Sequence, residues 1–193
     1  PNVFLFDQNQ LQVQWNEATP IGCGLNNLGN TCFLNSTLQC LTYTPCLTNL
    51  LQSRFHSKSC TNKGFCLFCI MESHVNATTK RSKNQSFTPK AFVANLRAIS
   101  KHFRRGRQED SHEFLRFVID HMQRNSLRAK GAAKLSKIDK ETSVIHSIFG
   151  GVLQSQVKCQ KCFYESDTFD PCLDLSLDIK GCNSLERALQ RFC

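Results

Sequence analysis

The sequence predicts an α+β fold, with a helical part first and a sheet part after it. Apolar residues recur at helical spacing in several segments before residue 143, whereas short apolar–polar alternations appear beyond Val144. Because helices and strands are grouped along the chain, the order indicates α+β rather than a parallel α/β sheet. The predicted organisation is an N-terminal arm over residues 1–20, a helical part over 21–143 and a sheet part over 144–193.

A turn rich in glycine and asparagine leads into the first predicted helix. Residues 22–31 hold three Gly and three Asn, which suit tight or left-handed backbone. The helix that follows begins near Cys32, because Leu34, Leu38 and Leu41 then share one face. Cys32 is therefore placed in the first helical turn.

Two more helices are predicted in the helical part. Thr88 is the expected N-cap of the first, with Pro89 as its first helical residue, and the second spans about 111–123. Their apolar stripes are Phe92, Leu96, Ile99 and Phe103 in the first, and Phe114, Leu115, Val118 and Met122 in the second. The polar segments 76–88 and 124–143 are expected to be an exposed loop and a mobile linker.

The sheet part contains a predicted hairpin. Strands over 152–158 and 163–169 flank the sequence Cys159-Gln160-Lys161-Cys162, which has the spacing of a zinc knuckle. The strict alternation of leucine and isoleucine from 173 to 179 predicts a half-buried strand. Ser184 is then expected to cap a short helix, whose apolar residues are Leu185, Ala188, Leu189 and Phe192.

Composition excludes several protein classes. The 193 residues fit one domain or part of a larger one, and 40% hydrophobic residues with 15 Phe supply a packed core. No apolar run approaches the roughly 20 residues of a bilayer-spanning helix, so a membrane protein is not expected. Residues 1–14 lack the pattern of a secretory leader. We therefore expect the twelve Cys to be reduced, some binding zinc and one being reactive, rather than forming a set of disulfides.

Positive charge is concentrated in the middle of the chain. The net charge of +9 divides into −2 for residues 1–50, +13 for 51–140 and −2 for 141–193. Such a basic region attracts nucleic acid or an acidic protein surface. It lacks the interleaved aromatic residues of a nucleic-acid reader, so nucleic acid is not expected as the main partner.

The position of Cys32 favours a reactive thiol. The free N–H groups and the dipole of a helix N-terminus stabilise a thiolate, which is the nucleophilic form of cysteine. The preceding turn can also bring an Asn amide and backbone N–H groups towards an attacked carbonyl, as an oxyanion hole. A buried, inert cysteine is the alternative interpretation.

Two segments resemble motifs of the ubiquitin-specific protease family. The cysteine box of that family is similar to Gly24–Gln39 (GLNNLGNTCFLNSTLQ), and a second box is similar to Gln108–Leu115 (QEDSHEFL), where Glu109 replaces the more common Gln. Together with Ser166–Pro171 (SDTFDP), they look most like the subgroup of ubiquitin carboxyl-terminal hydrolases 36, 42 and 17.

The resemblance implies a papain-like thiol protease that cleaves after the C-terminal Gly of ubiquitin. It implies a helical thumb lobe followed by the start of the fingers and palm sheet. Cys32 corresponds to the nucleophile and Asn27 to the oxyanion residue, while Asn30 lies nearby; both asparagines have a turn-forming alternative. Asp110 and Glu113 correspond to residues that hold the basic tail of ubiquitin, although Asp followed by Glu three residues later is also a capping box.

A cysteine protease also needs a general base. In the family this His stands in a Gly-rich box far downstream, and no such box occurs in these 193 residues. The sequence, which does not begin with Met, is therefore expected to be an N-terminal part of a catalytic domain that is inactive or nearly so by itself. A non-catalytic ubiquitin-binding or adaptor protein is the main alternative, and a zinc-stabilised nucleic-acid-binding module is the third.

Two sets of residues have metal-ligand spacing. His56, Cys60, Cys66 and Cys69 offer four ligands for a structural zinc, with His74 as an alternative to His56. Cys159 and Cys162 offer two ligands, and the second pair of this site lies further downstream in the family. Cys172, Cys182 and Cys193 have irregular spacing, so they are not expected to complete it. Zinc, ubiquitin and ubiquitinated proteins are the expected cofactor and partners, and the basic region favours a nuclear or nucleolar location.

Overall fold

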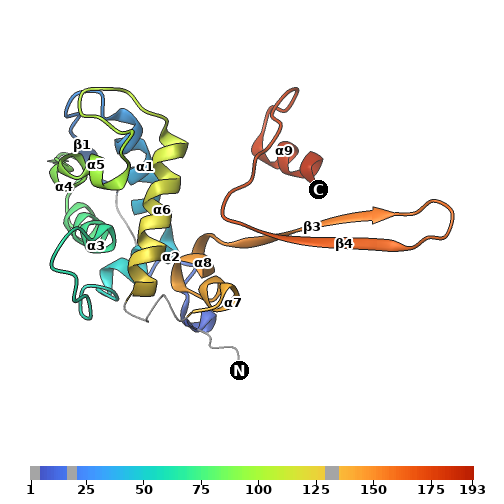
Figure 1. Ribbon diagram of the computed structural model, residues 1–193. Helices are drawn as coiled ribbons and strands as arrows, with labels where there is room; N and C mark the ends of the chain where they lie inside the picture. Colours follow the sequence, from blue (N-terminus) through green and yellow to red (C-terminus); the bar gives the residue numbers. More distant parts are fainter. Residues whose placement is uncertain (1–4, 17–20, 129–134) are drawn as a thin grey trace. The chain divides into compact units, whose positions relative to one another are not determined.

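The computed structural model of the protein describes residues 5–16, 21–128 and 135–193 (Figure 1). The chain divides into two compact units, residues 1–148 and 149–193. The sequence pattern suggests a division five residues earlier, before Val144. The later boundary arises because helix α8 (Val144–Phe149) begins with two residues, Val144 and Ile145, that are buried.

Helices make up most of the first unit. Helix α1 spans Cys32–Thr42, α2 spans Pro45–Gln52, α3 spans Leu67–Thr78 and the long helix α6 spans Ser111–Arg128. In Figure 1, α6 runs alongside α1, and these two helices pack directly on one another. The largest fully buried side chains lie on these helices and on the segment between α3 and α6; they include Leu34, Leu38, Phe68, Met71, Phe92, Phe103, Phe114 and Met122. This core fixes the starts of α1 and α6.

Two short strands join the turn before α1 to the segment after α3. Strand β1 (Gly24–Leu25) pairs in parallel with β2 (Ser86–Phe87). The amide of Asn26 extends this contact by donating to Thr88 Oγ1 at 2.8 Å. The predicted exposed loop over 76–88 is therefore partly helix and partly strand.

The predicted helix from Thr88 to Phe103 is divided in two. Helix α4 spans Lys90–Ala94 and α5 spans Leu96–Ile99, with Pro89 as N-cap of the first. Thr88 does not cap α4, because the helix begins one residue later than expected; the Thr88 hydroxyl accepts from Asn26 instead. Asn95 separates the two helices and donates its side-chain amide to Ala91 O at 2.8 Å. Side-chain bonding of Asn to nearby backbone competes with a continuous helix.

The linker predicted over 124–143 contains helical structure. Helix α6 continues to Arg128, and helix α7 occupies Lys137–Glu141. Ser136 caps α7 through a capping box with Asp139, a signal that is present in the sequence. Residues 129–134 lie outside the described part of the chain.

The N-terminal arm is attached to the first unit over its described residues. A 3₁₀ turn, η1, spans Gln8–Gln10. Phe6 is buried, and Asn49 of α2 donates its amide to the carbonyls of Gln12 and Gln14 at 3.2 and 2.7 Å. Although its backbone is mostly irregular, the arm is therefore held against the first unit by these contacts.

The second unit is a hairpin followed by a helix. Strand β3 (Gly151–Lys158) pairs antiparallel with β4 (Glu165–Cys172), with Gly151 opposite Cys172. Helix α9 spans Leu185–Phe192, and Ser184 caps it by accepting from the Arg187 N–H at 3.3 Å. Both features agree with the sequence pattern.

The strand predicted over 173–179 does not form. Leu173, Leu175 and Ile179 are all exposed, and this segment pairs with no strand among the described residues. A strand needs a hydrogen-bonding neighbour and a surface to bury one of its faces. Within the described chain, no helix is both long and apolar enough to cross a bilayer.

Candidate active site and metal cluster

Cys32 is the first residue of α1, and its side chain is exposed. The next two residues, Phe33 and Leu34, are buried in the core and anchor the first turn of the helix. Phe33 packs edge-on against Phe114 of α6, with ring centroids 5.5 Å apart. The thiol therefore lies at the surface on a rigid support, next to the free N–H groups of a helix N-terminus.

Asn27 locks the turn that precedes Cys32. Its Oδ1 accepts from the backbone N–H groups of Gly29 and Thr31 at 3.0 and 3.1 Å and from the Thr31 hydroxyl at 3.2 Å. These bonds occupy the carbonyl oxygen and leave the Nδ2 amide group without a partner among the described residues. The side chain is exposed. Asn27 thus has the turn-forming role, and it also keeps a donor available for a substrate oxygen.

Asn30 serves a different contact. Its Nδ2 donates to Gly106 O at 2.8 Å, in the loop before α6. Gly29 and Asn30 both have left-handed backbone, with φ of 90° and 55°, which Gly and Asn tolerate better than other residues. The structure therefore places the Asn30 amide in a bond between two loops rather than towards a substrate.

The start of α6 is fixed beside α1. Thr37 of α1 donates its hydroxyl to Phe33 O and Ser111 O, at 3.0 and 3.2 Å. Asp110 caps α6 by accepting from the Glu113 N–H at 2.8 Å through Oδ1. Both carboxylates are exposed. Asp110 therefore does cap α6, and the exposed carboxylates of Asp110 and Glu113 remain available to a cationic ligand.

Three histidines make contacts that do not involve Cys32. His121 Nε2 contacts Ile99 O at 2.9 Å, and His56 Nε2 contacts Cys66 Sγ at 3.1 Å. His74 lies between the rings of Phe87 and Phe92, with centroids 5.4 and 5.5 Å away. No hydrogen bond joins any of these three to Cys32 in the described part of the chain.

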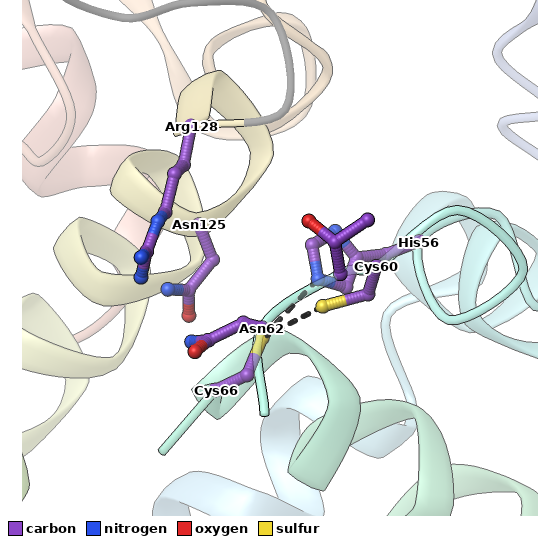
Figure 2. Close-up of a pocket in the computed structure, with 7 residues that line it drawn as sticks. His56, Cys60, Asn62, Cys66, Asn125 and Arg128 are labelled. Atoms are coloured by element: carbon purple, nitrogen blue, oxygen red, sulfur yellow. Dashed lines mark hydrogen bonds between the residues drawn. The ribbon is translucent and has the colours of Figure 1, made fainter. Parts of the chain in front are cut away.

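Four predicted ligands converge in a second cluster. The ligand atoms of His56, Cys60, Cys66 and Cys69 all lie within 4.8 Å of one another. Figure 2 shows His56 and Cys60 on one side and Cys66 opposite them, with Cys60 Sγ and Cys66 Sγ 3.9 Å apart. Tetrahedral zinc with Zn–S bonds of about 2.3 Å places two sulfurs about 3.8 Å apart. The donor set and its spacing therefore fit a metal ion.

Buried neighbours hold the metal cluster in place. Glu72 of α3, which is only 3% exposed, accepts from the backbone N–H groups of His56 and Ser57 at 2.7 and 3.0 Å. The His56 ring stacks on Phe68 at 4.6 Å. Asn125 of α6 accepts from Leu67 N–H at 3.0 Å, beside a cavity of about 140 Å³ that the cluster borders. The cluster therefore joins the segment after α2 to α3, and the Asn125 bond holds α3 to α6 beside it.

Burial controls protonation in the cluster. Burial lowers the pKa of His56, although the Glu72 carboxylate partly opposes this effect. Burial also raises the pKa of the Cys66 and Cys69 thiols. Burial thus favours the neutral imidazole of His56 and the protonated thiols of Cys66 and Cys69, and a metal must displace thiol protons when it binds.

Comparisons with known proteins identify the family. Residues 23–185, most of the chain, match the family described as ubiquitin carboxyl-terminal hydrolase. The chain belongs to this family.

Relatives in the ubiquitin carboxyl-terminal hydrolase family are similar over nearly the whole chain. Human ubiquitin carboxyl-terminal hydrolase 42 is 43% identical over 100% of this chain, and Arabidopsis thaliana ubiquitin carboxyl-terminal hydrolase 23 is 50% identical over 89%. The chain covers only 14% and 20% of those two proteins. The resemblance seen in the two sequence boxes is therefore confirmed.

A solved structure supports the fold. A chain of the SAGA DUB module of Ubp8, Sgf11, Sus1 and Sgf73 bound to monoubiquitin matches with a TM-score of 0.70 and 27% identity, over 88% of this chain and 38% of that one. The likeness confirms the predicted α+β, papain-like fold of ubiquitin-specific proteases.

The hydrolase family pattern did not decide between His56 and His74, but the geometry does. His74 is 4% exposed, and neither ring nitrogen has a hydrogen-bond partner among the described residues. Burial lowers its pKa to about 4. His56 lies with the three cysteines, so the geometry favours His56 over His74 as the fourth ligand.

The second predicted pair in this family member, Cys159 and Cys162, lies at the exposed turn of the β3–β4 hairpin. Backbone N–H groups of Cys162 and Lys161 lower the pKa of the Cys159 thiol. Within the described residues, only the His56 cluster brings three or more metal-binding side chains together. Cys182 instead lies 3.6 Å from an Arg191 nitrogen. Among the described residues, Cys159 and Cys162 therefore have no third metal-binding side chain beside them.

Sequence reasoning missed Glu72 and Asn125. The signal for Glu72 is a single acid between Met71 and His74, which are both buried on α3, since a charge within an apolar stripe needs partners. No local pattern marks Asn125, because its partner Leu67 is 58 residues away along the chain.

Proposed function

We propose that this chain forms the nucleophile-bearing part of a deubiquitinating cysteine protease, which hydrolyses the bond after the C-terminal Gly of ubiquitin. The observation that carries the proposal is the exposed Cys32 at the start of α1, beside a turn whose Asn27 keeps a free amide donor. Family membership supports the reaction type. The activity, substrates and partners of the longer protein are proposals here.

The residues of this chain suit the first chemical step. The Cys32 thiolate attacks the glycyl carbonyl, and the developing oxyanion accepts from Asn27 Nδ2 and from the Cys32 N–H. The amine of the modified protein leaves, and water then hydrolyses the thioester. A base must take the thiol proton and return it to the amine. The family resemblance assigns this base to a downstream His box.

Ubiquitin is the proposed partner of the α6 start. Asp110 and Glu113 are exposed carboxylates on a helix that Thr37 holds beside the nucleophile helix. Such carboxylates form charge-assisted hydrogen bonds with the basic ubiquitin tail that the resemblance implies. We also propose a nuclear location, on the basis of the basic middle region of the chain.

Zinc is the proposed metal of the His56 cluster. Three thiols and one imidazole are the donor set of a closed structural zinc site. Cys159 and Cys162 are proposed to bind a second zinc only together with two further ligands from the longer protein.

The function is tested with a ubiquitin probe that carries a C-terminal electrophile. Full-length protein should form a covalent adduct and hydrolyse a ubiquitin–aminocoumarin reporter, and Cys32→Ala should abolish both. The matched control is Cys40→Ser, which changes another exposed cysteine of α1 and should retain both. Binding of ubiquitin without an adduct would instead support the adaptor alternative. Salt-sensitive RNA binding alone would support the nucleic-acid alternative.

A further inference from the structure

The loop between α5 and α6 concentrates positive charge. Its residues 101–107, Lys101-His102-Phe103-Arg104-Arg105-Gly106-Arg107, are called the basic loop below. Its lysine and three arginines are all exposed. None of them forms an ion pair with another described residue, whereas Arg124 pairs with Asp120. Four cations within seven residues are therefore available to a partner.

The acidic residues that follow the loop do not neutralise it through ion pairs. Glu109 accepts from the backbone N–H of Arg104 at 3.3 Å, and Asp110 accepts from the Glu113 N–H. These carboxylates contact backbone rather than the arginine side chains. The surface thus has an acidic part at the start of α6 and a basic part before it.

The basic loop is fixed next to the nucleophile. Gly106 O accepts from Asn30 Nδ2 at 2.8 Å, and Asn30 precedes Cys32 by two residues, a separation of at most about 7 Å. Gly106 has a φ of 79°, a backbone conformation that Gly adopts without strain. Arg105 and Arg107 flank this glycine directly. Both side chains therefore start close to the turn that carries Cys32.

The other part of the loop is held by the core. Phe103 is fully buried, and its ring lies 6.1 Å from that of Phe33, 5.8 Å from Phe114 and 5.5 Å from Phe117. The arginines are thus presented from a loop anchored at two points. An anchored loop loses less conformational entropy on binding than a free one.

We propose that the basic loop docks an acidic segment of the protein to which ubiquitin is attached. This proposal rests on the proposed function, because the group that leaves from Cys32 is then a lysine amine of that protein. The residues that flank this lysine must pass close to the Cys32 turn. Guanidinium groups pair with carboxylates through two parallel hydrogen bonds. The loop therefore selects substrates with acidic residues near the modified lysine.

Two other partners fit the loop less well. The basic ubiquitin tail is repelled by cations and attracted by Asp110 and Glu113. Single-stranded nucleic acid is bound by cations together with exposed aromatic rings on which bases stack. Phe103, the only Phe, Tyr or Trp of the loop, is buried, which leaves the small imidazole of His102 as its single exposed ring. Binding of an acidic peptide, in contrast, requires only the positive charges of the loop.

The test compares two conjugates and one reporter with the full-length protein. In one conjugate ubiquitin is attached to a peptide lysine flanked by four Glu, and in the other by four Gln; the reporter is ubiquitin–aminocoumarin. We expect kcat/KM to be about tenfold higher for the Glu conjugate at low salt, falling to below about twofold in 0.5 M NaCl because salt screens exposed charges.

Two sets of substitutions distinguish an effect of the basic loop from a general effect of positive surface charge. Arg104→Gln/Arg105→Gln/Arg107→Gln should cleave both conjugates equally and leave reporter hydrolysis unchanged. Lys80→Gln/Lys83→Gln/Lys90→Gln removes three exposed cations elsewhere and should keep the Glu preference.

Several results would overturn the proposal. Equal cleavage of the two conjugates by the wild type would do so, as would a Glu preference that survives in the loop variant. Loss of binding to a single-stranded RNA in the loop variant, without any Glu preference in the wild type, would assign the loop to nucleic acid. Failure of the wild type to hydrolyse the reporter would instead overturn the proposed function, and this proposal with it.

Discussion

Asn27 illustrates how one side chain serves both the backbone and a substrate. Its Oδ1 holds the turn through Gly29 and Thr31, and its Nδ2 is the proposed oxyanion donor. Asn27→Asp keeps the acceptor and removes the donor. We expect kcat for ubiquitin–aminocoumarin to fall about 100-fold or more, as when one oxyanion donor is lost. The measurement is steady-state hydrolysis by the full-length protein.

The matched variant for this prediction is Asn30→Asp. It removes the amide that binds Gly106 and leaves the proposed oxyanion donor in place, so its kcat should fall by much less. Retained activity in Asn27→Asp would show that Asn27 only forms the turn.

His74 makes folding stability depend on pH. Burial lowers its pKa to about 4 from an ordinary 6.5, so the unfolded chain binds the proton more tightly than the folded one. Stability is therefore full above pH 6.5 and decreases as the pH falls through 6.5 towards 4. The difference of about 2.5 pH units corresponds to about 3 kcal/mol.

His74→Leu removes this titration. We expect the free energy of unfolding of the wild type, relative to this variant, to decrease by about 2 to 3 kcal/mol between pH 7.5 and pH 4.5. Urea titration followed by the fluorescence of Trp15, the single tryptophan, gives both values. His102→Gln, at an exposed position, is the control. A difference between wild type and His74→Leu that does not change with pH would contradict the assignment.

At the scale of single elements, local signals predicted some boundaries and missed others. The starts of α1 and α9 could be predicted, because a turn or a capping Ser precedes an apolar helical stripe. Helix α3 was missed because its ligand cysteines suggested a loop, although most of its residues are apolar. The interruption at Asn95 depends on a side-chain bond that periodicity does not reveal.

The site could be predicted to a similar extent. Cys32, Asn27 and the α6 carboxylates stand in local motifs, and the ligands His56, Cys60, Cys66 and Cys69 stand in one short segment. The Asn30–Gly106 bond joins residues 76 positions apart. No local pattern contains such a contact, so it required the folded structure.

The start of α6 combines a helix cap with a proposed binding site, and substitutions of Asp110 can separate the two. Asp110→Asn keeps a good N-cap and removes the charge. We expect the KM for ubiquitin–aminocoumarin to rise about tenfold, with the free energy of unfolding nearly unchanged.

Asp110→Ala should raise KM similarly and also reduce the free energy of unfolding by about 1 kcal/mol, because the Glu113 N–H loses its acceptor. Steady-state kinetics and urea titration give the two quantities. An unchanged KM in Asp110→Asn would leave Asp110 as a cap alone.

At the scale of the whole molecule, the two units differ in how much of their apolar side-chain surface they bury. The first unit buries its apolar stripes, whereas the second exposes Val152, Val157 and Phe169 of its hairpin. A two-stranded hairpin is at most marginally stable without further packing. The alternation from 173 to 179 is thus a signal for a partner strand that the described chain does not supply.

The same contrast predicts the metal content of the 193-residue chain. The His56 cluster offers four converging ligands, while Cys159 and Cys162 offer two at an exposed turn, and a structural zinc needs four. Elemental analysis after dialysis should therefore give near one zinc per chain. Cys60→Ser/Cys66→Ser should remove it, whereas Cys159→Ser/Cys162→Ser should not. Two tightly held zinc ions, or a zinc that survives the first double substitution, would mean that the exposed cysteines find ligands the structure does not bring together.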